Sequence, residues 1–168
     1  QRGAQDLCTR SKPTNIIDLA AITSIYRPGP LSAKVDKDYV EAKGSPQYIK
    51  YIHPIVREHT ENTYGFLIFQ EQIAILAHKL GKDISLDEGN ILRKLLTKKG
   101  TGKGAEERLV IKGKFIEGCI EKGIAKHAAE KLWGTFEYFS GYGFNKSHAV
   151  SYCLLSFQCA WLFHHYPA

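Results

Sequence analysis

The sequence contains no methionine among its 168 residues, and its cysteines form no C-x-x-C pair. The missing initiator methionine leads us to expect an excerpt of a longer protein. The four cysteines are Cys8, Cys119, Cys153 and Cys159. Their spacing matches no zinc motif, and no apolar run has the length of a signal peptide or a membrane span. We therefore expect a reduced, cytoplasmic protein without a membrane segment.

Apolar residues and basic residues are both well represented. The hydrophobic fraction is 43%, which is enough to bury a core in a chain of this length. The formal net charge is +6 and the isoelectric point is near 9.1. A basic balance of this size favours an acidic partner, such as nucleic acid or a nucleotide.

Hydrophobic periodicity predicts a mainly α fold built from many helices. The predicted helices span residues 14–26, 33–43, 70–80, 86–98, 105–122, 126–139 and 146–165. Ser85 and Glu88 match a capping box at the start of one of them. Residues 63–69 form a short apolar run that we expect to be extended. Because the last helix is apolar on most sides, we expect it to be central.

The chain is organised around the stretch GYGFNKSH at residues 141–148, which runs directly into the last helix. Gly141 and Gly143 allow a tight turn and a close approach of the backbone, and Asn145 or Ser147 can cap the helix. The free N–H groups of a helix start favour an anion. This pattern predicts a phosphate-binding turn, although a loop that only positions a helix would have a similar sequence.

Two further basic features accompany this turn. Arg27 precedes Pro28-Gly29-Pro30, a rigid turn that would hold the guanidinium in one place, or would simply end a helix beside an exposed arginine. Residues 93–103 contain five basic residues and no acid, and they end in a glycine-rich tract. This tract is not a P-loop, since a helix precedes it and Gly104 follows Lys103. It predicts either a mobile basic tip that approaches a polyanion or a charged surface that is simply solvated.

Five motifs in register resemble the fingers region of the C-family DNA polymerases, the bacterial replicative polymerase III alpha subunits. The motifs are Arg27-Pro28-Gly29-Pro30-Leu31, Tyr64-Gly65 with Gln70-Glu71-Gln72, Leu92-Arg93-Lys94 with Lys98-Lys99, the GYGFNKSHA stretch at 141–149, and His165-Tyr166-Pro167-Ala168. Their order and spacing match over essentially the whole chain. The resemblance implies a helical fingers subdomain that closes on the incoming deoxynucleoside triphosphate and on the templating base.

The resemblance also implies roles for individual residues. The residues implied to face the triphosphate are Arg27, Arg93, Lys98, Lys146 and His148. Gly141, Gly143, Asn145 and Ser147 would form the supporting turn. Lys94, Lys99 and Lys103 would contact the DNA backbone. The implied partners are primer-template DNA, the incoming nucleotide, the remaining polymerase domains and a replisome clamp.

In this family the reaction is nucleotide addition assisted by two Mg²⁺ ions on carboxylates of the palm. The resemblance places the palm before the Arg-Pro-Gly-Pro turn and outside this chain, so we expect the chain alone to be inactive. It divides into residues 1–26, a segment that follows the palm, a basic helical region at 27–140, and the turn with its apolar helix at 141–168. Two other classes stay open, a non-catalytic basic DNA-binding module and a helical partner-binding domain.

Overall fold

The computed structural model describes residues 2–97 and 103–167 and confirms a mainly α fold. The helices of the first half are α1 (Arg2–Ser11), α2 (Ile16–Ile25), α3 (Pro28–Ser32), α4 (Val35–Gly44) and α5 (Pro54–Thr60), with the 3-10 turns η1 (Pro46–Tyr48) and η2 (Glu61–Thr63). The second half contains α6 (Gln70–Leu80), α7 (Leu86–Thr97), α8 (Lys103–Glu121), α9 (Lys126–Ser140) and α10 (Lys146–His165). Within these residues no helix is both long and apolar enough to cross a bilayer.

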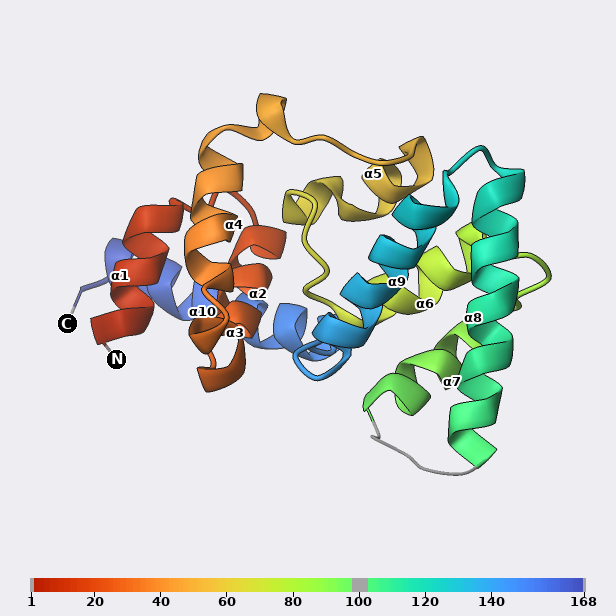
Figure 1. Cartoon of the computed structure of the whole chain (residues 1–168). Helices are drawn as coiled ribbons and strands as arrows, with labels where there is room; N and C mark the ends of the chain where they lie inside the picture. The colour runs from red at the N-terminus through yellow and green to blue at the C-terminus, as the bar shows by residue number, and fades with distance from the viewer. Residues whose placement is uncertain (1, 98–102, 168) are drawn as a thin grey trace.

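The helices form two groups that lie side by side (Figure 1). Helices α1 to α4 and the first turns of α10 enclose one core, which includes Leu7, Ile22 and Tyr39. Helices α5 to α9 enclose a second core, in which the rings of Phe115, Trp133 and Phe136 contact one another. Trp133 and Phe136 of α9 are therefore core residues, whereas Tyr138 of the same helix is exposed. Phe139 packs against both cores and links the two groups.

Local signals explain where several helices begin. Asn15 caps α2 by accepting the N–H of Asp18 at 2.9 Å. The predicted capping box of α7 is present, with Ser85 N–H donating to Glu88 at 2.8 Å and Glu88 N–H donating to Ser85 Oγ at 3.1 Å. Lys114 of α8 also donates to Glu88, at 2.8 Å, and these donors lower the pKa of Glu88 to about 2. The cap of α7 thus also ties α7 to α8.

Two expectations need correction at the level of single elements. The Pro28-Gly29-Pro30 turn continues as the short helix α3, because proline suits the first turn of a helix and Arg27 takes the N-cap position. The extended segment begins at Phe66 rather than Thr63, since η2 extends to Thr63 and Tyr64 and Gly65 form a left-handed turn. Leu67, Ile68 and Phe69 are buried and lead into α6.

Helix α10 is not central among the described residues, contrary to our expectation. Only Ala149 and Cys153 are buried, and both lie against the α1–α4 group. The large apolar side chains from Leu154 onward are exposed, including Phe157, Trp161 and Phe163. An apolar helix surface indicates that a helix needs a partner, but it does not say that the partner lies nearby in the chain.

Helix α8 passes directly over the end of α6, and Gly118 makes this approach possible. A Cβ atom on Gly118 would lie 2.3 Å from the carbonyl carbon of Gly81 and 2.4 Å from the carbonyl oxygen of Leu80. Lys82 N–H donates to the Lys114 carbonyl at 3.0 Å, so the two backbones are also bonded to each other. A Cβ atom at position 118 would therefore push the two backbones apart and break the hydrogen bond between Lys82 and Lys114.

Gly118→Ala is therefore expected to destabilise the α5–α9 group by about 2 kcal/mol through overpacking. Gly113 on the same helix is a matched control, because a Cβ atom there would meet no atom within 4 Å. Gly113→Ala should stabilise α8 by about 0.5–1 kcal/mol through helix propensity. Opening free energies from hydrogen exchange of α8 amides measure both effects. Equal effects of the two substitutions would contradict the close packing at Gly118.

Candidate functional site

The stretch at residues 141–148 is held by a segment more than 70 residues earlier in the chain. Phe69 and Phe144 form a parallel β-bridge, with Phe144 N–H donating to the Ile68 carbonyl at 3.0 Å and Gln70 N–H donating to the Phe144 carbonyl at 2.9 Å. The bridge joins the start of α6 to the turn before α10. The turn is therefore tied to α6 by backbone hydrogen bonds, and Phe144 packs against the first core.

The start of α10 is capped by groups of the chain itself. Asn145, and not Ser147, is the N-cap residue, and its Oδ1 accepts the N–H of His148 at 2.8 Å. The Lys146 N–H donates to Glu71 Oε2 at 3.1 Å. Two of the N–H groups that we predicted to be free for a phosphate are thus already paired. The side chains of Lys146 and His148 are exposed at the same helix start.

Arg27 reaches the turn from α3. Its Nε donates to the Ser24 carbonyl at 2.8 Å, its Nη2 donates to the Tyr142 carbonyl, and its guanidinium lies 4.8 Å from the centre of the Phe144 ring. Burial lowers the pKa of Arg27 from its ordinary value, but an arginine stays charged at neutral pH. The Tyr142 ring packs on Gly29, where a Cβ atom would come within 2.5 Å of it.

Arg93 reaches the turn from α7 through one intermediate side chain. Its Nη1 donates to Gln70 Oε1, and Gln70 Nε2 donates to the Gly143 carbonyl at 2.9 Å. Gln70 is the first residue of α6, so the relay connects three elements. Its side chain also explains the small residue at position 143, because a Cβ atom there would lie 2.9 Å from Gln70 Cγ.

Aromatic rings lie beside Lys146 and His148 of α10. Lys146 Nζ lies 5.7 Å from the centre of the Phe69 ring. The His148 ring lies 5.5 Å from that of Phe144 and 4.7 Å from that of Tyr152. Both side chains remain exposed at the surface beside these rings. The structure thus gathers Arg27, Arg93, Lys146 and His148 around one turn.

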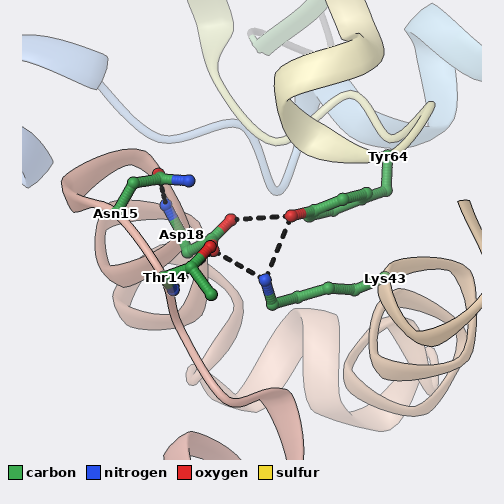
Figure 2. A network of polar contacts seen from close by, with 5 residues as sticks. All are labelled: Thr14, Asn15, Asp18, Lys43 and Tyr64. Carbon is green, nitrogen blue, oxygen red and sulfur yellow. Dashed lines mark hydrogen bonds and ion pairs between the residues drawn. The ribbon is translucent and has the colours of Figure 1, made fainter.

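A buried ion pair anchors the start of the segment that bridges to this turn (Figure 2). Asp18 of α2 is fully buried, and its carboxylate accepts from Lys43 Nζ of α4 at 2.7 Å and from Tyr64 Oη at 3.1 Å. Lys43 Nζ also donates to Tyr64 Oη at 3.1 Å. Thr14 adds two donors, its N–H at 2.9 Å and its hydroxyl at 3.0 Å. This network fixes Tyr64, five residues before the bridge at Phe69.

Of the three lysines predicted to contact the DNA backbone, and of Lys98, the structure describes the side chain of one. Lys94 is exposed on α7. Lys98, Lys99 and the side chain of Lys103 lie outside the described residues. Neither Gly141 nor Gly143 has a left-handed backbone, so the turn itself does not require glycine conformations.

Sequence reasoning missed the role of Gln70 and Glu71 in holding the turn. In the sequence both appear only as members of the Gln70-Glu71-Gln72 motif, with no contact assigned to them. The Glu71 carboxylate in fact contacts Asn145 and Lys146. The sequence shows that the Gln70-Glu71-Gln72 motif and the 141–149 motif occur together. A single sequence does not show that the two motifs are in contact.

Comparison with known proteins agrees with the resemblance. Residues 1–123 match the family model for the bacterial DNA polymerase III alpha subunit finger domain. A DNA polymerase III subunit alpha from Borreliella burgdorferi is 39% identical over 165 residues, 98% of this chain and 14% of that protein. Proteins of the same name from Treponema pallidum and Aquifex aeolicus are 38% and 34% identical, each over 99% of this chain and 14% of their own length.

The chain thus spans about a seventh of the length of these curated relatives, as the 14% coverage shows. The aligned region covers 98% of the chain and therefore continues past residue 123, where the match to the family model ends. The family suggested by the five sequence motifs is confirmed. The chain belongs to the bacterial DNA polymerase III alpha subunit finger domain family.

Proposed function

We propose that this chain is the finger part of a replicative DNA-directed DNA polymerase, in which it binds the triphosphate of the incoming nucleotide and the nearby primer-template DNA. The observation that carries the proposal is the convergence of Arg27, Arg93, Lys146 and His148 on the turn at residues 141–148. They come from α7, α10 and the N-cap of α3, so the fold and not the local sequence brings them together.

The proposed roles follow from the contacts of each residue. Lys146 and His148 have exposed tips, and Arg93 lies one side chain away from the turn. These three side chains would neutralise charge that builds on the phosphates as pyrophosphate leaves. Arg27 is half-buried and donates to the Ser24 and Tyr142 carbonyls, so its role is to hold the turn beside them. Lys98 belongs to the same proposed set.

The two Mg²⁺ ions of the reaction would stabilise the attacking and leaving oxygens. Among the described residues, no group of three or more His, Cys, Asp and Glu side chains comes together. Asp36, for example, pairs with Arg10 at 3.4 Å. The palm of the same polypeptide would hold both ions. We infer that the chain by itself does not extend a primer, which a primer-extension assay checks.

Other surfaces of the chain are proposed to contact DNA and the remaining polymerase domains. Lys94, Lys99 and Lys103 are proposed contacts to the DNA backbone, which would make DNA binding salt-dependent. The exposed apolar face of α10, with Leu154, Phe157 and Trp161, would pack against other domains of the same polypeptide. A replisome clamp is a further proposed partner, and the cytoplasm is the proposed compartment.

Substitution of Lys146 tests the proposal directly in the whole polymerase. Lys146→Ala is expected to raise the KM for deoxynucleoside triphosphate about tenfold, the effect of removing one charge-assisted phosphate contact. Lys126→Ala is a matched control, because Lys126 is exposed and is likewise the first residue of its helix, α9. It should leave the KM unchanged.

Primer-template affinity measured on the same proteins separates the two candidate functions. Under the proposed function, Lys146→Ala changes the nucleotide KM much more than the DNA affinity. A change in DNA affinity with an unaltered nucleotide KM would instead support a non-catalytic DNA-binding module. An effect of Lys126→Ala equal to that of Lys146→Ala would also contradict the proposal.

A further inference from the structure

Glu71 uses both of its carboxylate oxygens on the turn before α10. Oε1 accepts from Asn145 Nδ2 at 2.9 Å, and Oε2 accepts from the Lys146 N–H at 3.1 Å. The contacts span 74 and 75 residues of sequence. The Asn145 side chain is used at both ends as well, because its Oδ1 accepts the His148 N–H at 2.8 Å. One carboxylate therefore orders the N-cap and, through it, the first turn of α10.

The location of these contacts gives them consequences for the binding residues. They lie next to the β-bridge between Phe69 and Phe144, so they lengthen the connection between the starts of α6 and α10. Lys146 follows the N-cap directly and His148 is the residue whose N–H the N-cap accepts. The directions of the Lys146 and His148 side chains relative to α6 thus depend on the Glu71–Asn145 pair.

We propose that Glu71 is a positioning residue for nucleotide binding, which sets the orientation of Lys146 and His148 through Asn145. The inference rests on the proposed function of these two residues as triphosphate ligands. Glu71 is not itself a phosphate ligand, because its carboxylate would repel the triphosphate. Its effect on binding is indirect. Glu71 holds the turn in one conformation, and without it the Lys146 and His148 side chains would adopt many orientations relative to the triphosphate.

A positioning role and a purely electrostatic role of Glu71 predict changes of opposite sign in the nucleotide KM when Glu71 is replaced by glutamine. If Glu71 acted only as a negative charge near the triphosphate, its neutralisation would lower the nucleotide KM by removing repulsion. If it positions the turn, Glu71→Gln raises the KM, because the amide has a single acceptor oxygen for two donors. The sign of the change in KM therefore distinguishes the two roles without any assumption about magnitude.

An exchange of the two side chains makes the test sharper. In the double variant Glu71→Gln/Asn145→Asp, the new amide can donate to the new carboxylate and accept the Lys146 N–H. The new carboxylate can still accept the His148 N–H, since aspartate is a good N-cap. The net charge equals that of the parent. In Asn145→Asp alone, two carboxylates would face each other at the distance now bridged by a hydrogen bond.

The experiment measures KM and kcat for a deoxynucleoside triphosphate in primer extension by the whole polymerase. Glu71→Gln and Asn145→Asp are each expected to raise the KM about fivefold, the effect of one lost hydrogen bond to a charged group at a partly exposed site. The double variant should return to within about twofold of the parent. Thermal unfolding of all four proteins shows whether any change reflects general instability.

Two results would overturn the inference. One is a lower KM in Glu71→Gln, and the other is a double variant whose KM is the product of the two single effects. Lys146→Ala is assayed in parallel to keep this result separate from the proposed function. If Lys146→Ala leaves the KM unchanged, the proposed function fails. If Lys146→Ala raises the KM but the exchange restores nothing, only the role of Glu71 fails.

Discussion

Replacement of Lys43 by methionine is expected to destabilise the α1–α4 group by about 3–5 kcal/mol. The methionine keeps most of the volume but leaves the Asp18 carboxylate fully buried without its cation. Tyr64 and Thr14 would still donate to Asp18, but neither carries a charge. Opening free energies from hydrogen exchange of α2 and α4 amides in the whole polymerase measure the loss.

Matched variants test whether the loss of stability in Lys43→Met comes from the unpaired Asp18 carboxylate. Lys37→Met, on the exposed face of α4, should change the opening free energy by less than about 0.5 kcal/mol. The double variant Asp18→Asn/Lys43→Met should be more stable than Lys43→Met alone, because no buried charge is left. A loss in Lys43→Met no larger than that in Lys37→Met would show that the ion pair contributes nothing.

The dependence on pH has a defined sign. Burial alone would raise the pKa of Asp18, but the hydrogen bonds from Lys43 and Thr14 outweigh it and lower the pKa. Burial alone would lower the pKa of Lys43, but its hydrogen bonds to Asp18 and Tyr64 raise it. The contribution of Asp18 is thus complete above its ordinary pKa of about 4 and is lost as the pH falls through its lowered pKa.

The contribution of Lys43 is complete below its ordinary pKa of about 10.4 and is lost as the pH rises through its raised pKa. The parent should therefore keep the full contribution of the network at neutral pH. In Lys43→Met, burial without a cation favours the protonated carboxyl. The deficit of this variant should accordingly narrow as the pH is lowered from about 7 to about 5.

Gln72→Leu is expected to destabilise the segment before α6 by about 3 kcal/mol. The buried Gln72 amide accepts the N–H groups of Ile68 and Phe69, each at 2.9 Å. It also donates to the His59 carbonyl at 3.1 Å and to Thr63 Oγ1 at 2.8 Å. Leucine would leave the two buried N–H groups without an acceptor, and each such group costs about 1–3 kcal/mol.

Hydrogen exchange of the Ile68 and Phe69 amides measures this effect where it arises. Gln5→Leu, an exposed glutamine on α1, is the control and should change stability little. Because Phe69 bridges to Phe144, we also expect the nucleotide KM of the whole polymerase to rise in Gln72→Leu. Protection of these two amides equal to that in the parent would contradict the assigned role.

The helix boundaries were largely predictable because they depend on neighbours in sequence. Helices α6 and α10 have the predicted limits, and the Ser85–Glu88 box marks the start of α7. Periodicity and caps are local signals, so a single sequence contains them in full. The prediction that α10 is central was wrong because the signal was also local. The apolar surface of α10 indicates that the helix is buried by a partner, but it does not indicate which part of a polypeptide that partner is.

The organisation of the site could be predicted only in part. The motifs identified the turn and the cationic residues, but not the groups that hold them. Asp18 and Tyr64 are 46 residues apart, and Glu71 and Asn145 are 74 residues apart. Exposed acids and amides occur throughout the chain, so residue type alone does not select these pairs. Tertiary packing brings each pair within hydrogen-bond distance: Asp18 and Tyr64 between α2 and the end of η2, and Glu71 and Asn145 between the starts of α6 and α10.

The second core has a practical consequence for cutting the polymerase into fragments. The match to the family model ends at residue 123, but the core of α5 to α9 continues through Trp133 and Phe136. A fragment that stopped at residue 123 would remove both rings from the face of Phe115 and expose a large apolar surface. Expression boundaries for this region should therefore follow the packing of α9 and not the limits of sequence similarity.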